Sequence, residues 1–222
     1  MKRYGKKPAG RYDTPGLVEA QFEPGSCRRV LKNLLGIKRK REMDRVEARE
    51  QLRALNELIK IYGKTRRFTA ADICRIHYVW LGNIYSWAGK YRQVNLSKGN
   101  FPFAAATQIP RLMQELERGA LRQFTPCCFD SIDEVARALA VVHTELVLIH
   151  PFRDGNGRTA RLLANLMALQ AGLPSLDFSN LKGHKKKEYF AAIQTGLDRD
   201  YELLKEIFSG VIRETLQKRK TY

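Results

Sequence analysis

The chain is poor in the features that mark secreted and membrane proteins. Its 222 residues include only four cysteines, and none of them stands in the paired CxxC spacing of metal and redox motifs. No apolar run approaches the roughly 18 residues that a membrane span requires, and the basic N-terminus has no apolar segment behind it. We therefore expect reduced thiols and a cytoplasmic protein with neither a disulfide scaffold nor a membrane span.

Acidic residues are also scarce, with 23 Asp and Glu against 40 Lys and Arg and a formal net charge of +17. The excess is concentrated in residues 1–67, which hold 19 basic and 8 acidic side chains. Such a surface attracts nucleic acid, acidic proteins or anionic lipid, although a merely solubilising face would look the same. No signature of a DNA- or RNA-binding module accompanies it, so a nucleic-acid partner of the basic N-terminal region rests on charge alone.

Internal repeats are absent and strand patterns are rare, whereas apolar residues at helical spacing are frequent. That spacing predicts helices at residues 42–62, 69–85, 105–118, 132–149, 158–171, 185–197 and 199–218. A strand–turn–strand pattern covers residues 91–96, 97–100 and 101–103. Residues 1–26 combine Gly, Pro and basic side chains without a period, which indicates an extended arm. The predicted fold class is all-α with one small β-hairpin, around one sizeable core.

The segment between the two most apolar helices, residues 150–161, carries an unusual density of polar chemistry. Gly155 and Gly157 permit positive φ and a close approach of a ligand to the backbone, beside a helix N-terminus whose dipole favours anions. Arg158 and Arg161 stand three residues apart and therefore on one face of that helix. Two guanidinium groups beside such an anion nest predict a polyphosphate site.

Three further side chains complete this segment. Asp154 offers a hard carboxylate oxygen, which is how Mg²⁺ is usually held beside phosphates. Asn156 can donate to a phosphate oxygen, and His150 titrates near neutral pH and can take a proton from an attacking hydroxyl. Taken singly, each residue has a plainer explanation as a turn, a helix cap or a solvated face. Their conjunction in twelve residues favours phosphoryl-type transfer with a general base.

The segment resembles the Fic motif, HxFx(D/E)GNGRxxR, and matches it at every defined position: His150, Phe152, Asp154, Gly155, Asn156, Gly157, Arg158 and Arg161. The run from Trp87 to Arg92 and the hairpin after it resemble the family's flap. The flap residues are Lys98, Gly99, Asn100, Phe101 and Phe103. The resemblance covers about residues 68–210 and implies a Fic/Fido helical bundle there, preceded by a basic arm at 1–36 and a helical segment at 37–67, and followed by a basic tail at 211–222.

The resemblance also implies a role for each motif residue. His150 is the general base, Asp154 holds the metal, and Phe152 anchors the loop in the core. Arg158 binds the β-phosphate of ATP and Arg161 the γ-phosphate. The α- and β-phosphates are cradled by Gly155, Asn156 and Gly157.

The flap is implied to align the second substrate. It docks the backbone of a target protein as an added strand, which brings a target hydroxyl in line with the α-phosphorus. Tyr189 and Ile193 are candidates for the adenine pocket, although both fit core packing equally well. ATP and Mg²⁺ are thus the expected substrate and cofactor, and the identity of the target protein stays unknown.

Branches of the family with different variants of the motif transfer different chemical groups. The Doc branch has lysine at the second glycine and moves phosphate, and a phosphocholine-transferring branch has alanine at the first glycine and lysine at the first arginine. Here these positions are Gly155, Gly157 and Arg158, which implies AMP transfer to a Ser, Thr or Tyr hydroxyl, with another nucleotide as the open alternative. The alternative from another class is a basic nucleic-acid-binding or regulatory protein with a vestigial Fic site, which the complete motif disfavours.

Many Fic proteins carry an inhibitory helix, (S/T)xxxE(G/N), whose glutamate pairs with the second motif arginine. No Ser or Thr of this chain has Glu four residues later. The nearest match runs from Lys38 to Glu42 and lacks the hydroxyl residue. Three alternatives stay open: Glu42 acts in a degenerate helix, a separate antitoxin-like protein supplies the glutamate to a toxin, or the enzyme is unrestrained. The missing Ser or Thr at position 38 favours the separate partner, as does like charge between Lys38 and Arg161.

Overall fold

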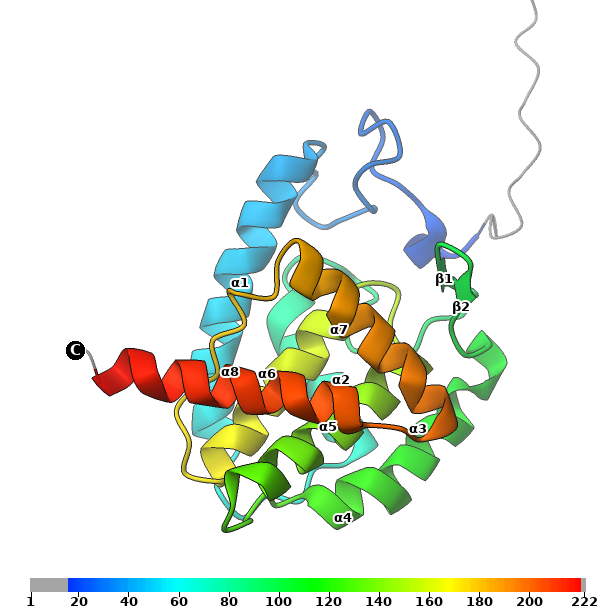
Figure 1. Cartoon of the computed structure of the whole chain (residues 1–222). Helices are drawn as coiled ribbons and strands as arrows, with labels where there is room; N and C mark the ends of the chain where they lie inside the picture. Colours follow the sequence, from blue (N-terminus) through cyan, green and yellow to red (C-terminus); the bar gives the residue numbers. More distant parts are fainter. Residues whose placement is uncertain (1–15, 221–222) are drawn as a thin grey trace, which may run out of the picture.

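The computed structural model describes residues 16–220, which form a body of packed helices with one short hairpin (Figure 1). The helices are α1 (Lys40–Ile61), α2 (Ala70–Leu81), α3 (Ile109–Leu116), α4 (Arg122–Phe124), α5 (Ile132–Ile149), α6 (Asn156–Gln170), α7 (His184–Thr195) and α8 (Glu202–Lys220). The strands β1 (Ser97–Lys98) and β2 (Phe101–Pro102) pair antiparallel. This confirms the predicted all-α class with a small hairpin.

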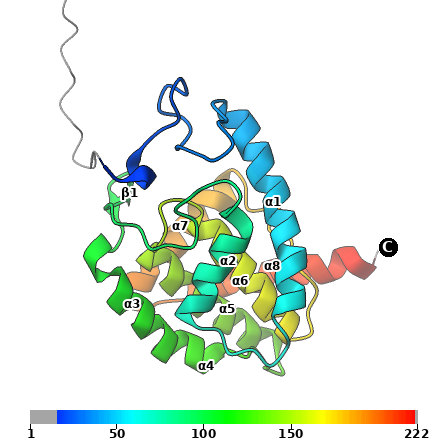
Figure 2. The same ribbon diagram turned by 180° about the vertical axis from the view of Figure 1, so that it is seen from behind.

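Helix α5 lies in the middle of the body and has the bounds that its apolar periodicity predicts. Ser131 and Glu134 form a capping box at its start, which satisfies backbone N–H groups that a helix end leaves free. Helix α5 packs against α6 and α8. Helices α1 and α2 lie on the opposite side of the molecule from α8, so α5 and α6 are covered on both sides (Figures 1 and 2). The loop that joins α5 to α6 therefore connects two buried helix ends.

Some helix ends differ from the predicted ones. Thr69 and Asp72 form the predicted capping box of α2, but the helix ends at Leu81 rather than near residue 85. The chain turns there because the N–H groups of residues 84 and 85 both donate to the Leu81 carbonyl. Helix α6 begins two residues before its predicted start, because the left-handed conformation of Gly155 caps it. The helix predicted at 105–118 is divided into a 3₁₀ turn (Ala106–Gln108), α3 and a π turn (Glu117–Leu121).

The prediction of a strand at residues 91–96 is wrong. Strand pairing begins only at Ser97, although the Leu96 carbonyl accepts the Phe103 N–H over 3.1 Å; further upstream, the Arg92 N–H donates to the Pro151 carbonyl of the α5–α6 loop over 2.8 Å. The guanidinium of Arg92 is buried and donates to the carbonyl oxygens of His150 (2.7 Å), Val94 (2.6 Å) and Ala104 (2.6 Å). Burial still alternates here, since Arg92 and Val94 are buried while Gln93 and Asn95 are exposed, but the backbone N–H groups of Arg92 and Gln93 bond to the α5–α6 loop and to Glu19 rather than to a neighbouring strand.

The N-terminal arm differs from the predicted extended arm in the part that the structure describes. Residues 1–15 and 221–222 lie outside the described residues. Residues 16–36 fold against the body. The carboxylate of Glu19 accepts the Gln93 N–H (2.7 Å), and its carbonyl accepts Arg153 Nε (2.8 Å). The expected basic tail continues α8 as far as Lys220. No helix among residues 16–220 has both the length and the apolar character that crossing a membrane requires, and all four cysteines are free thiols.

Candidate active site

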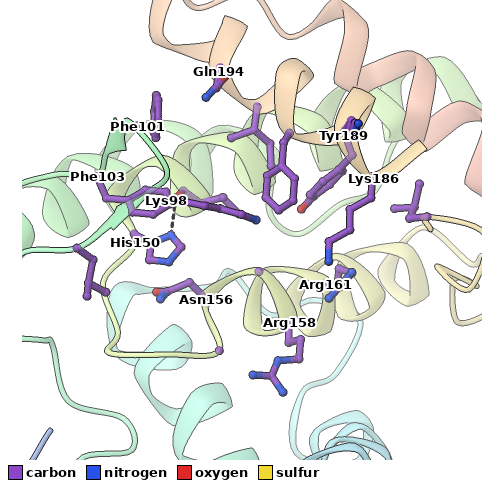
Figure 3. Close-up of a pocket in the computed structure, with 18 of the residues that line it drawn as sticks. Lys98, Phe101, Phe103, His150, Asn156, Arg158, Arg161, Lys186, Tyr189 and Gln194 are labelled. Atoms are coloured by element: carbon purple, nitrogen blue, oxygen red, sulfur yellow. Dashed lines mark hydrogen bonds between the residues drawn. The ribbon is translucent and has the colours of Figure 1, made fainter. Parts of the chain in front are cut away.

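A cavity of about 1110 Å³ opens between the α5–α6 loop, the hairpin and α7 (Figure 3). Most of the residues singled out from the sequence line it: Lys98, Phe101, Phe103, His150, Asp154, Gly155, Asn156, Gly157, Arg158, Arg161, Tyr189 and Ile193. The turn residues Gly99 and Asn100 lie outside this lining. Elements that are far apart in the sequence thus form one site.

His150 occupies the C-terminal end of α5 in the left-handed conformation, with φ +53°. Its ring Nδ1 lies 3.1 Å from the Val147 carbonyl, which can only accept, so Nδ1 carries the proton and Nε2 keeps a lone pair. The ring stacks on Phe103 of the hairpin with 3.6 Å between ring centroids. Burial lowers the pKa of His150 to about 4. The histidine is therefore neutral at neutral pH, which is the state that a proton acceptor needs.

His77 of helix α2 fixes the loop that follows His150. Gly89 N–H donates to Nδ1 of the buried His77 (2.8 Å), so His77 Nε2 donates to the Asp154 carbonyl (3.1 Å). The His77 ring also stacks on the fully buried Phe152, with centroids 3.9 Å apart. Phe152 lies in the core, as predicted. His77 itself was not expected, because a lone histidine in an apolar helix carries no sequence signal of such a contact.

Gly155 is required at its position for two reasons. Its φ of +82° lies in the region that favours glycine, and an added Cβ would come within 2.8 Å of the Trp80 ring. Gly157 differs, since it lies in the first turn of α6 and an added Cβ would meet no atom within 4 Å. The backbone at Gly157 is therefore open on its cavity side, at a helix N-terminus that favours anions.

The side chain of Asn156 is engaged by the loop rather than free for a ligand. Its Oδ1 accepts the Phe152 N–H and its Nδ2 donates to the Phe152 carbonyl, both over 2.8 Å. Asn156 is 2% exposed. These two bonds hold the loop closed on itself, and the expected donation from this amide to a phosphate stays a prediction.

The side chains of the two motif arginines point to different sides of α6. Arg158 points to the side of α6 away from α7 (Figure 3), where it pairs with the buried Glu47 of α1. Burial opposes the charge of Arg158, but Glu47 and Asp154 outweigh it and raise its pKa. Arg161 instead lies near Lys186 of α7, on the Tyr189 side of the cavity (Figure 3). The Arg161 guanidinium has no carboxylate partner among residues 16–220.

The inhibitory role expected for Glu42 has no structural support. Glu42 is exposed in the first turn of α1. The same helix brings Glu47, five residues later, to the motif, and Glu47 contacts Arg158 rather than Arg161. Glu47 was missed because α1 is rich in charged residues. The available signal was its place beside Met43 on the apolar side of that helix.

Tyr189 and Ile193 line the cavity and are buried, with 7% and 3% exposure. The Tyr189 hydroxyl bonds to His143 Nε2 of α5, and burial raises the pKa of Tyr189 to about 12. On the opposite wall, Lys98 of the hairpin lies over the Phe190 ring, 2.9 Å from its centroid. The hairpin and α7 therefore meet above the cavity.

Asp154 has the properties of a ligand for a hard cation. Its side chain is 45% exposed, and Oδ1 accepts the Gly155 N–H over 2.6 Å. No group of three or more His, Cys, Asp or Glu side chains suited to a metal occurs in the described part of the chain. One carboxylate fits Mg²⁺ when phosphate oxygens and water supply the other ligands.

Comparison with known proteins agrees with this geometry. Residues 67–168 match the model of the Fic/DOC family. The chain is 35% identical over 145 residues to protein adenylyltransferase VbhT of Bartonella schoenbuchensis, covering 64% of this chain and 30% of that protein. It is 28% identical over 190 residues to the probable protein adenylyltransferase Fic of Escherichia coli K12, covering 83% and 88%.

A solved structure agrees over most of the fold. The N-terminal Fic domain of a putative cell filamentation protein from Bartonella quintana, with bound ADP, is 28% identical. It matches 86% of this chain and 92% of its own with a TM-score of 0.67. The family match lies within residues 67–168, which include the motif loop, and these comparisons support a Fic family protein. The chain nevertheless spans less than a third of the length of several curated relatives that it matches, including VbhT.

Proposed function

We propose that this protein is an adenylyltransferase that moves AMP from ATP to a Ser, Thr or Tyr hydroxyl of another protein. The observation that carries the proposal is the pairing of a neutral histidine with an anion site in one cavity. His150 presents Nε2 beside the open backbone at Gly157 and the N-terminus of α6. The relatives named protein adenylyltransferase support the choice of group.

In the proposed step, the target hydroxyl oxygen attacks the α-phosphorus of ATP. A bond forms between that oxygen and phosphorus, the bond from phosphorus to the β-phosphate oxygen breaks, and pyrophosphate leaves. His150 Nε2 takes the proton of the hydroxyl. Asp154 would hold Mg²⁺, which neutralises phosphate charge when it is bound. Arg161 would meet the outermost phosphate from its side of the cavity.

The hairpin is proposed to align the target. Its strands β1 and β2 are two residues each, so an added extended segment of a target would find a free edge there. Phe103 stacks on His150, which places the base of the hairpin against the proposed proton acceptor. A target backbone docked on this hairpin would bring its hydroxyl to Nε2.

We also propose that restraint comes from a separate antitoxin-like protein, which would make this chain a toxin in the cytoplasm. Arg161 has no carboxylate partner among the described residues, and Glu42 is exposed. A glutamate supplied from outside would compete with the γ-phosphate for this guanidinium. The isolated chain should then be active without any substitution.

The test is transfer from ATP labelled at the α-phosphorus, with Mg²⁺ and a cell lysate, followed by mass spectrometry for added AMP on the labelled band. His150→Asn is the matched variant, because asparagine tolerates the positive φ at this position. Label in wild type and at least about a hundredfold less in the variant, the lower end of the range for a general base, is the expected result. Equal labelling by both proteins, or none by wild type, would contradict the proposal and favour a vestigial site on a basic binding protein.

A further inference from the structure

Glu47 is a buried carboxylate that connects α1 to the anion loop. Its side chain is 2% exposed. Oε1 accepts the Tyr85 hydroxyl over 2.7 Å, and Oε2 pairs with Arg158 Nη1. Its backbone carbonyl accepts Trp80 Nε1 over 2.9 Å. Both carboxylate oxygens and the main chain of Glu47 are therefore fixed by neighbours, and the carboxylate cannot follow Arg158 if that side chain moves.

Arg158 stands between two carboxylates. Its guanidinium lies 4.6 Å from the Trp80 ring centroid, in a cation–π position. On one side Nη1 pairs closely with Glu47, and on the other Nη2 lies 3.5 Å from Asp154 Oδ1. A separation of 3.5 Å is at the weak limit of a hydrogen bond. The shorter contact to Glu47 thus holds the guanidinium off Asp154.

We propose that Glu47 is a positioning residue of the nucleotide site: it holds Arg158 against Trp80 and prevents it from closing onto Asp154. Arg158 then keeps N–H donors available for a phosphate oxygen, and Asp154 keeps its oxygens available for a cation. This inference rests on the proposed nucleotide chemistry, but it concerns binding and not transfer.

The charge of Glu47 also has an opposite effect on nucleotide binding. The negative charge of Glu47 also weakens the attraction of Arg158 for phosphates, so its removal could tighten nucleotide binding. Arg158 is 28% exposed, and Asp154 lies within reach. Without Glu47, the half-buried guanidinium would turn to the remaining carboxylate, since a charge that is partly removed from water and left unpaired is costly. That new pair would occupy the proposed cation ligand, so loss of Glu47 weakens binding.

The test is calorimetry of the full chain with a non-hydrolysable ATP analogue, AMPPNP, at several Mg²⁺ concentrations. In Glu47→Gln we expect the Kd for AMPPNP to rise about tenfold, the lower end of the cost of losing a residue that keeps a metal ligand in place, and the Mg²⁺ needed for half-maximal binding to rise with it. The Kd for AMP should stay within about twofold, because Arg158 is placed for phosphates that AMP lacks. Glu42→Gln removes an exposed charge from the same helix and should change none of these values.

Two results decide against the proposal. Equal or tighter AMPPNP binding in Glu47→Gln would mean that Glu47 restrains Arg158 or merely anchors α1. Equal weakening of AMP and AMPPNP would mean general loss of structure. If Glu47→Gln does not fold by circular dichroism, Glu47→Asp decides by the same criteria, because it keeps the charge but is one methylene too short to hold Arg158. None of these measurements depends on AMP transfer, so they stand even if labelling fails.

Discussion

The guanidinium of Arg92 donates a 2.7 Å hydrogen bond to the main-chain carbonyl of His150, the residue that presents the proposed base. The same group donates to the carbonyls of Val94 and Ala104, which lie on either side of the hairpin. Arg92 is 1% exposed, and burial lowers its pKa to about 10. One side chain therefore fixes both the base and the hairpin that faces it.

We expect Arg92→Lys to damage both stability and transfer. A lysine ammonium cannot reproduce the planar fork that reaches four carbonyls at once, and each carbonyl left unpaired in the interior is costly. The expected loss is about 2–3 kcal/mol of unfolding free energy, with a clear fall in the labelling rate of the folded fraction. Urea denaturation and initial labelling rates measure the two effects. Arg111→Lys, at an exposed pair with Glu115, is the control and should be neutral.

Gly155 and Gly157 should respond in opposite ways to alanine. Gly155→Ala places a Cβ against Trp80 at positive φ, so we expect it to destabilise the fold by about 2 kcal/mol or more. Gly157→Ala meets no protein atom and lies in a helix, so stability should hold or rise while AMPPNP binding falls, because the methyl enters the cavity. Thermal melting and calorimetry on both variants give the answer. A stable Gly155→Ala would show that the α2 contact is not needed.

The labelling rate should depend on pH less than is usual for a histidine base. Because the pKa of His150 is lowered to about 4, its neutral form persists as pH falls from 8 to 6, and kcat/KM for transfer should stay flat over that range. Protonation should reduce the rate only as pH approaches 4–5. A fall by half near pH 6.5 would instead indicate an ordinary histidine.

Loss of folding stability at low pH limits the pH range over which that rate can be measured. His77, His143 and His150 all have pKa values lowered by burial, to about 4, 3 and 4. As pH falls below about 6.5, the unfolded chain binds protons that the folded chain does not, so the free energy of unfolding decreases. The fraction folded should therefore be measured by circular dichroism at each pH. A melting temperature that rises between pH 6.5 and 5 would contradict the assignment of these histidines as neutral and buried.

Arg161→Ala should weaken the binding of ATP more than the binding of ADP. Arg161 lines the cavity without a carboxylate partner among residues 16–220, in the place proposed for the outermost phosphate. We expect calorimetry to show a loss of ATP affinity of about tenfold or more and a much smaller loss for ADP, since one charge-assisted contact is removed. Arg161→Lys keeps the charge and should lie between. Equal losses for ATP and ADP would place Arg161 elsewhere.

The sequence was informative where local periodicity determines structure. Helix α5 has the predicted bounds because its apolar stripe, its Ser131 cap and the break at His150 agree with one another. The motif loop was equally well determined, since Gly155 and the polar residues around it lie within a dozen positions. In each case the decisive neighbours are close in the sequence.

Contacts between distant segments could not be predicted in this way. Arg92 resembles any surface arginine until its four carbonyl partners are known, and two of these, Val94 and Ala104, follow from how the hairpin folds back. Glu47 is 111 residues from Arg158 and lies in a helix rich in charges. The contact of Asn156 with the backbone of Phe152 was also not predicted, because a side-chain pattern does not show which backbone group an amide will meet.

The left-handed backbone of His150 has a further consequence. A residue other than glycine or asparagine at φ +53° stores conformational strain, and here the strain falls on the residue chosen for its lone pair. Natural selection for stability alone would favour glycine or asparagine at position 150. The chain thus carries a small thermodynamic penalty at its proposed centre of chemistry, and variants that lose the imidazole can melt at a higher temperature than the parent protein. Screens that rank substitutions by thermostability would therefore select against the proposed proton acceptor.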